Sequence, residues 1–197
     1  MTGIINYGAG NIFSLTAALD RLDIRYGMVN KADELAAYDR IIIPGVGHAG
    51  AAMHKLQASG LAACVGQLTK PVLGICVGMQ LLTAYSEEGN SPLLDIIPVK
   101  TLHFEHRITA KVPHVGWNRV FHENGCPLFD NIAKDAYFYF VHAYYIEYNT
   151  TFTAAFTQYG LKFSAALQDK NFYGVQFHPE KSGAAGEQLL LNFSNLS

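Results

Sequence analysis

Cys76 stands in a pattern that suits a nucleophile. Gly74 and Gly78 flank it, and an apolar run that ends at Ile75 precedes it. A tight turn from a strand into a helix needs small residues on either side of the nucleophile. The helix N-terminus stabilises a thiolate, and the amide of Val77 would face an oxyanion formed beside the sulfur. The alternative is a small buried hydrophobe, which is the commonest fate of a free cysteine.

A thiol that attacks an amide also needs a base that later protonates the departing amine. Among eight histidines, His178 lies at the end of a predicted buried strand, and Glu180 follows two residues later. A carboxylate there could orient the imidazole and stabilise its cation. Alone, a histidine at a strand end is more often structural. His142 is the main competitor as base, and we interpret it as a structural or substrate-loop histidine.

The elements that would position these residues alternate in type along the first half of the chain. Strands that alternate with helices are typical of a largely parallel sheet covered by helices, and the ends of its strands collect functional sites. The expected strands are Gly3–Tyr7, Ile24–Val29, Arg40–Ile43 and Pro71–Ile75; the expected helices begin at Asn11, near Gly50 and at Cys76, the last of them continuing to Tyr85.

After Gly89 the pattern changes to short alternating runs, which are typical of antiparallel strands. We find no repeat or linker and predict one domain over residues 1–197. The predicted fold class is α/β, an open, mostly parallel twisted sheet with helices on both faces and additional antiparallel strands. The later strands are expected at Val99–Phe104, Tyr137–Val141, Thr153–Thr157, Phe163–Leu167 and Tyr173–Phe177, with a last helix over Ala184–Phe193.

Composition narrows the class of protein. Half of the 197 residues are hydrophobic, and the formal net charge of -2 gives no reason to expect nucleic acid. We see no signal peptide and no apolar run that could cross a bilayer, so no membrane contact is expected. Cys64, Cys76 and Cys126 form no C-x-x-C pair. A disulfide framework or metal site is therefore not predicted, and a reducing cytoplasm fits best.

Together the Gly74–Gly78 segment and the late His178-Pro179-Glu180 run resemble the class I, or triad-type, glutamine amidotransferase family. That resemblance implies a flavodoxin-like α/β fold and no cofactor. It also implies that Cys76 forms a glutamyl thioester with L-glutamine, that His178 moves the proton and that Glu180 holds His178.

Further segments, including Pro44–Gly47, Pro113–Asn118 and His178–Ser182, are similar to the glutaminase subunits of imidazole glycerol phosphate synthases, from about Gly3 to Phe193. This likeness implies site roles that sequence spacing alone does not. The implied oxyanion residues are Val46, Gly47 and Val77, and the implied glutamine-binding residues are Gly47, Gln80, Glu88, Ala143 and Tyr144. Without it, Pro44–Gly47 reads as an ordinary turn, Gln80 as a polar helix position and Glu88 as a solvated charge.

The same resemblance implies a partner, a (β/α)8 barrel cyclase that receives the ammonia in a heterodimer. Trp117, the only tryptophan, could instead be a core residue in a Gly-Trp-Asn turn, but tryptophan is well suited to anchor an interface. The candidate interface or coupling residues are Trp117, Asn118, Tyr139 and Lys181. We further expect weak glutaminase activity until the partner and its ligand shift Pro44–Gly47, which we call the oxyanion segment.

Three alternatives remain open on the sequence. Glutaminases of pyridoxal phosphate, anthranilate or guanylate synthesis share the chemistry, although the Pro113–Asn118 segment separates them from this chain. A non-enzymatic binding subunit of the same fold is the second, and a cysteine peptidase-like hydrolase is the third.

Overall fold

A computed structural model describes residues 1–8, 12–122 and 125–196 of the chain. The sequence also predicts a turn at Gly8-Ala9-Gly10 and a helix N-cap at Asn11, and residues 9–11 of these lie outside the described residues. Among the residues that are described, no helix is long and apolar enough to cross a bilayer.

The strands that carry the elbow at Cys76 form the parallel half of the main sheet. Their continuous apolar runs follow from burial on both faces, as at Ile41, Ile42 and Ile43, which are fully buried. The strands are β1 (Thr2–Ile5), β2 (Tyr26–Val29), β3 (Arg40–Ile43), β4 (Val72–Ile75) and β14 (Phe172–Val175). Their order is β2-β1-β3-β4-β14, and every adjacent pair is parallel.

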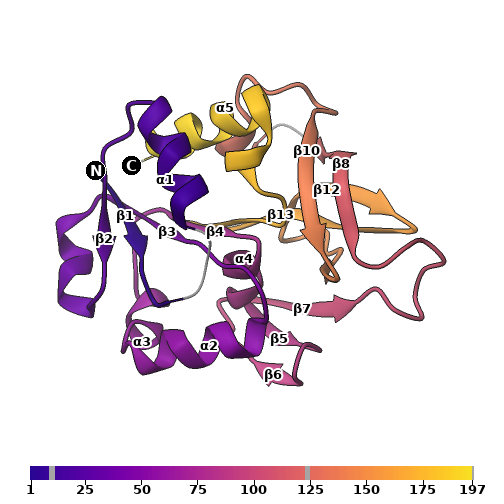
Figure 1. Cartoon of the computed structure of the whole chain (residues 1–197), viewed down its shortest axis with the longest axis horizontal. Helices are drawn as coiled ribbons and strands as arrows, with labels where there is room; N and C mark the ends of the chain where they lie inside the picture. Colours follow the sequence, from indigo (N-terminus) through magenta and orange to yellow (C-terminus); the bar gives the residue numbers. More distant parts are fainter. Residues whose placement is uncertain (9–11, 123–124, 197) are drawn as a thin grey trace.

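The other half of the sheet continues from β14 and is mostly antiparallel. Its strands are β13 (Leu161–Asp169), β11 (Tyr144–Glu147), β7 (Ile97–His103), β5 (Thr83–Ser86) and β6 (Ser91–Pro92), in that order, with β12 (Thr153–Tyr159) and β9 (Phe121–His122) branching from β13. A separate antiparallel pair, β8 (His114–Arg119) and β10 (Tyr137–His142), stands beside it. Figure 1 shows this pair at the opposite end of the molecule from β2.

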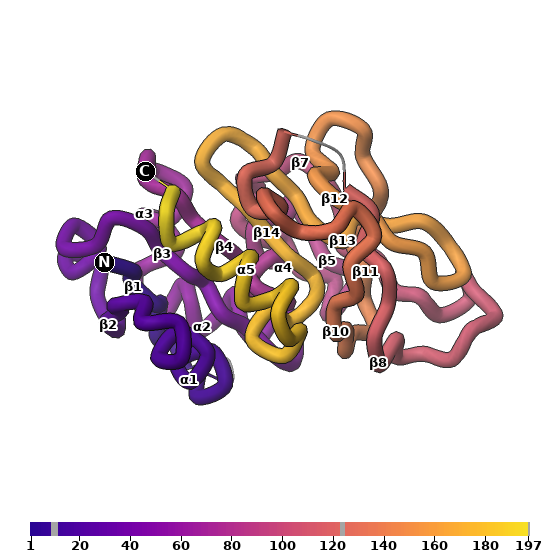
Figure 2. The backbone as a smooth tube through the Cα atoms, turned by 90° about the horizontal axis from the view of Figure 1, so that it is seen from above, coloured from indigo at the N-terminus to yellow at the C-terminus, as the bar shows by residue number. Residues whose placement is uncertain are grey.

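Helices cover both faces of the parallel half, in agreement with the predicted fold class. Figure 1 shows α1 (Ile12–Arg21) and α5 (Gly183–Ser194) on one face, and α2 (Ala49–Ala58) and α3 (Ala62–Val65) on the other. Helix α4 (Val77–Leu81) follows β4, and short 3₁₀ turns occupy Ala32–Ala37, Pro127–Phe129 and Pro179–Lys181. Both chain termini lie at the β2 end (Figure 2).

Two local predictions are wrong. The helix expected from Cys76 to Tyr85 ends at Leu81, because Thr83 turns its hydroxyl back onto the carbonyl of Gln80 (2.8 Å) and the chain enters β5. Trp117 does not lie in a turn but within β8, where it pairs with Tyr139 of β10.

Candidate active site

The backbone at Cys76 has the conformation of a nucleophile elbow. Its φ of 53° is unusual for a residue with a side chain, and it marks the end of β4 and the start of α4. A Cβ at Gly78 would lie 1.8 Å from the carbonyl oxygen of Ile43, and one at Gly74 would lie 2.5 Å from the oxygen of Gly78. The steric need for glycine at both positions, predicted from the sequence, is therefore confirmed.

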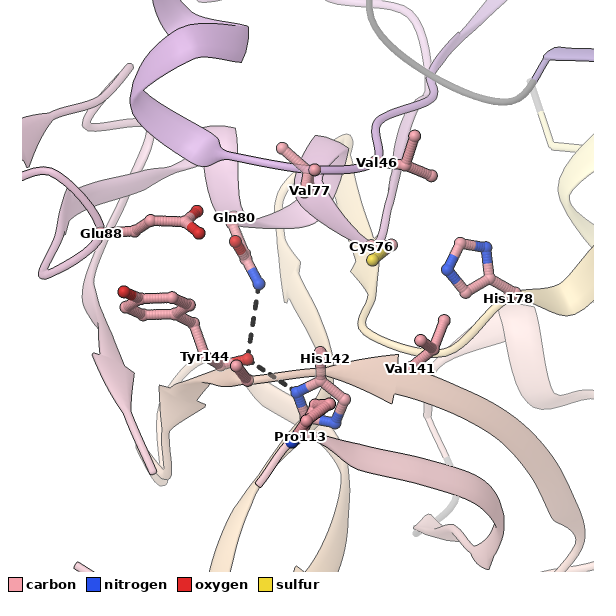
Figure 3. Close-up of a pocket in the computed structure, with 12 residues that line it drawn as sticks. Val46, Cys76, Val77, Gln80, Glu88, Pro113, Val141, His142, Tyr144 and His178 are labelled. Atoms are coloured by element: carbon pink, nitrogen blue, oxygen red, sulfur yellow. Dashed lines mark hydrogen bonds between the residues drawn. The ribbon is translucent and has the colours of Figure 1, made fainter. Parts of the chain in front are cut away.

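His178 and Glu180 form a buried pair. Imidazole Nδ1 lies 2.7 Å from Glu180 Oε1, and the two side chains are only 4% and 5% exposed. His178 does not stand at the immediate end of a strand, because β14 ends at Val175, two residues earlier than the expected Phe177. Its backbone N–H donates to the carbonyl of Tyr139 on β10 (2.9 Å). Since the carboxylate can only accept, Nδ1 carries hydrogen and Nε2 is left to face the cysteine side of the cavity (Figure 3).

Opposing influences set the charge of the His178 imidazole. Burial by itself would lower its pKa, but interaction with Cys76 and the hydrogen bond and charge of Glu180 raise the pKa to about 10. Within the described part of the chain, Nε2 makes no hydrogen bond of ordinary geometry. The arrangement favours a protonated imidazole between sulfur and carboxylate.

A cavity of about 300 Å³ opens at Cys76. It lies beyond the carboxyl ends of β4 and β14, where parallel sheets place their sites. Figure 3 shows Cys76 and His178 on one side of it, with Gln80, Glu88 and Tyr144 on the other. The full lining is Val46, Gly47, Cys76, Val77, Gln80, Glu88, Pro113, Val141, His142, Ala143, Tyr144 and His178.

The oxyanion candidates lie on this cavity, but one of their donors is occupied. The Val77 N–H donates to the carbonyl of Gly45 at 3.3 Å, so it does not point freely at the cavity. Gly47, with a φ of 87°, gives the following backbone a conformation that only glycine adopts readily. The peptide after Gly45 would have to rotate before the Val77 amide could bind an oxyanion.

The glutamine-binding candidates also meet at the cavity. Gln80 is buried, and its Nε2 lies 3.5 Å from the carbonyl oxygen of Tyr144 and 3.2 Å from Gln176 Oε1. Glu88 accepts a hydrogen bond from the amide of Ala49 at the start of α2 (2.5 Å). A half-buried carboxylate and buried amides on one wall suit the ammonium and carboxylate groups of an amino acid.

Two of the interface candidates lie on an exposed face beside the cavity. Trp117 of β8 is 55% exposed and contacts the ring of Tyr139 on β10, with centroids 6.1 Å apart. Alternation along the two strands also turns Val115, Tyr137 and Val141 outward, and all three are exposed. These five residues form what we call the β8–β10 face, whose member Val141 also lines the cavity.

Asn118, a further interface candidate, is connected to the cavity through a row of hydrogen-bonded side chains. Its Nδ2 lies 3.4 Å from His114 Nε2, His114 Nδ1 lies 3.0 Å from His142 Nε2, and His142 Nδ1 lies 2.6 Å from the Tyr144 carbonyl. Since that carbonyl only accepts, each histidine carries its hydrogen on Nδ1. His142 is thus a buried group with hydrogen bonds on both ring nitrogens, and it also lines the cavity, so both sequence interpretations, structural or substrate-loop histidine, stay open. Lys181 is exposed and its N–H donates to the His178 carbonyl (3.0 Å).

Three residues at the site escaped sequence reasoning. The side-chain amide of Gln176 lies 3.7 Å from the Cys76 sulfur, and the hydroxyl of Tyr7 donates to the carbonyl of Pro44 in the oxyanion segment. The rings of His114 and His142 are hydrogen-bonded to each other. Of the three, only Gln176 could have been found from the sequence pattern, since it is a polar residue inside the apolar run that ends at Phe177.

Comparisons with known proteins agree on one family. The sequence model described as "Glutamine amidotransferase class-I" matches residues 3–195. The chain is 47% identical to the imidazole glycerol phosphate synthase subunit HisH of Haemophilus influenzae, over 96% of this chain and 94% of that one. It is 45% identical to the subunit of that name from Bacteroides fragilis (strain YCH46), over 98% of both.

Solved structures share the fold at lower identity. PurLQS from Thermotoga maritima aligns with a TM-score of 0.74 at 17% identity, over 98% of this chain and 97% of that one. A structure described as a glutamine amidotransferase aligns with a TM-score of 0.75 at 16% identity, over 98% and 96% of the two chains.

Proposed function

This chain belongs to the class I glutamine amidotransferase family, and we propose that it is the glutamine-hydrolysing subunit of an imidazole glycerol phosphate synthase in histidine biosynthesis. The observation that carries the proposal is the meeting of Cys76 with the His178–Glu180 pair at one cavity. Relatives named as imidazole glycerol phosphate synthase subunit HisH, at 44–47% identity over nearly the full chain, favour this pathway over those served by other glutaminases.

The proposed reaction begins with L-glutamine in the cavity. The Cys76 sulfur attacks the side-chain amide carbon, and the carbonyl oxygen becomes an oxyanion. His178 gives its Nε2 proton to the amide nitrogen, which leaves as ammonia, and a glutamyl thioester remains. Water then attacks the thioester as His178 takes a proton from it, and glutamate departs as the sulfur is restored. Glu180 keeps the imidazole oriented throughout.

Roles for the cavity walls follow from their chemistry. Glu88 would pair with the ammonium group of glutamine, while Gln80 and the backbone of Ala143 and Tyr144 would hold its polar groups. The oxyanion would be bound by the amide of Val77 together with that of Val46 or Gly47. Because the Val77 amide now donates to Gly45, this oxyanion site would form only after the segment rotates.

The relatives are named as subunits of a larger enzyme, which implies a partner for this chain as well. We propose that the partner is a (β/α)8 cyclase, which docks on the β8–β10 face to form a heterodimer. Four of the five residues of this face are exposed apolar or aromatic side chains, and Val141 belongs to both face and cavity. Docking there would close the cavity and let ammonia pass to the partner without entering water. We keep the cytoplasm as the proposed location, because the reaction needs Cys76 as a free thiol.

The test measures glutamate release by the full chain alone, with a cyclase subunit, and with that subunit plus its nucleotide ligand. We expect slow release by the lone chain and stimulation by about tenfold or more in the ternary mixture. Cys76→Ala should abolish release and labelling by a glutamine-like electrophile. Cys64→Ala, a change at a half-buried cysteine away from the cavity, should leave both intact. Release that survives Cys76→Ala would refute the mechanism.

A further inference from the structure

Gln176 is a polar side chain with no exposed surface, and the reaction steps above do not use it. It follows β14 directly and stands between Val175 and Phe177, which are also fully buried. A buried amide is costly unless its donors and acceptor find partners. The partners of Gln176 are Gln80 and the sulfur of Cys76.

The direction of these hydrogen bonds is fixed by a backbone carbonyl. The oxygen of Tyr144 can only accept, so the NH₂ group of Gln80 faces it at 3.5 Å. The same NH₂ group lies 3.2 Å from Gln176, which must therefore present its oxygen to Gln80. The remaining group of Gln176, its own NH₂, then lies 3.7 Å from Cys76 Sγ. Turning the Gln176 amide over would set two NH₂ groups against each other.

We propose that Gln176 is a further catalytic residue, whose side-chain amide donates a hydrogen bond to the Cys76 sulfur and stabilises it as a thiolate. The inference deepens the proposed function and rests on it. A hydrogen bond to an anionic acceptor is roughly twice as strong as one between neutral groups, so the donor favours the charged sulfur over the neutral thiol.

The Cys76 sulfur carries a negative charge at two stages of the proposed reaction. The sulfur is anionic before it attacks glutamine, nearly neutral in the thioester, and anionic again as water displaces it. A fixed donor at the sulfur therefore assists both the formation of the nucleophile and its departure. Because Gln80 lines the cavity and orients Gln176, glutamine that binds Gln80 acts on the sulfur through one intervening side chain.

The experiment follows the rate at which iodoacetamide alkylates Cys76 from pH 5 to 10, read by mass spectrometry of the Cys76 peptide in the full chain. Gln176→Met keeps the length of the side chain and removes the donor. We expect alkylation near pH 6.5 to fall roughly tenfold, the effect of losing one hydrogen bond to a charged group. At alkaline pH, where the thiolate forms without help, the rate should return to that of the wild type.

Two further variants keep the result decisive. Gln80→Met leaves Gln176 in place but frees its amide to turn, so it should shift the profile the same way by a smaller factor, and it serves if Gln176→Met fails to fold. Gln188→Met, at a side chain of α5 bonded to Asn192, should leave the profile unchanged. A merely structural role would change the alkaline rate and leave the position of the profile where it was, and that result would overturn the inference.

The two proposals fail separately. Glutaminase activity that survives Cys76→Ala would remove the proposed function itself. If Cys76→Ala is inactive but the alkylation profile of Gln176→Met matches that of the wild type, only the role of Gln176 is wrong.

Discussion

In the proposed reaction, Glu180 acts through its 2.7 Å hydrogen bond with His178. Glu180→Gln keeps the shape of the side chain and removes its charge, so the pKa of His178 should fall from about 10. We expect the rate of partner-stimulated glutaminase to fall roughly a hundredfold, within the range for general acid–base groups. Glu187→Gln, which breaks the surface pair with Arg21, is the matched control and should keep the wild-type rate.

The same substitution has a signed effect on stability. Folding raises the pKa of His178 from 6.5 to about 10, so protonated His178 stabilises the fold. This contribution is fully present below pH 6.5 and disappears as the pH rises through about 10. The difference in unfolding free energy between wild type and Glu180→Gln should therefore be largest near pH 6 and small at pH 10. Urea unfolding at both values measures it, and a difference that grows with pH would contradict the assignment.

Among the elements, the oxyanion segment is held by a side chain that lies two residues beyond the end of β1. The hydroxyl of Tyr7 donates to the carbonyl of Pro44 at 2.7 Å, and burial together with the nearby Cys76 raises the pKa of Tyr7, so it stays a donor. Tyr7→Phe should loosen the segment before Gly45. We expect partner-independent glutamate release to rise several-fold, with a loss of about 1 kcal/mol in unfolding free energy.

Tyr26→Phe provides the control, since that hydroxyl makes only a 3.4 Å contact with Asp20 at the surface. If Tyr7→Phe lowers stability yet leaves the release by the lone chain unchanged, the hydroxyl supports the fold and does not restrain the oxyanion segment.

The paired histidines of β8 and β10 make the fold sensitive to acid. Burial lowers the pKa of His114 to about 4 and that of His142 to about 3. Below pH 6.5 these histidines bind protons in the unfolded chain but stay neutral in the folded chain. Each histidine should therefore lower the unfolding free energy by about 1.4 kcal/mol per pH unit, down to about pH 4. His114→Gln should halve the part of this slope that the pair contributes, as measured by urea unfolding at pH 6.5, 5.5 and 4.5.

His106→Gln removes a histidine that is 91% exposed and should leave the slope as in the wild type. Equal slopes for wild type and His114→Gln would mean that His114 is already protonated in the fold.

The elements differ in how far local sequence determines them. β3 was predicted at its observed bounds because Ile41–Ile43 form an apolar run between clear breaks. The end of α4 was missed because it depends on the Thr83 hydroxyl and on pairing with β7, which lies further along the chain. The elbow could be predicted because its glycines are neighbours in sequence. The contact of Gln176 with Cys76 could not, since the sequence around Gln176 shows a polar residue in an apolar run but not which residue its amide contacts.

At the scale of the whole molecule, the two halves of the sheet have separate tasks. The parallel half sets Cys76 and His178 at the carboxyl ends of adjacent strands, β4 and β14. The antiparallel half and the β8–β10 pair supply the opposite wall, including Tyr144, and the exposed face next to it. His178 joins the two, because its N–H donates to the carbonyl of Tyr139 on β10. A partner that moves β10 would therefore act directly on the segment that carries His178, the proposed base.

Trp117 is the residue best placed to anchor such a partner. With 55% of its surface exposed, it contributes little to the core, so Trp117→Ala should change the unfolding free energy by less than about 1 kcal/mol. Its loss from the centre of an interface should weaken association with the proposed cyclase partner roughly thirtyfold, the effect of a hot-spot residue. Titration calorimetry would measure this, with Tyr148→Ala, a 40% exposed aromatic outside the β8–β10 face, as control. Equal affinities for the two variants would move the docking site away from β8 and β10, and with it the proposed route by which the partner reaches His178.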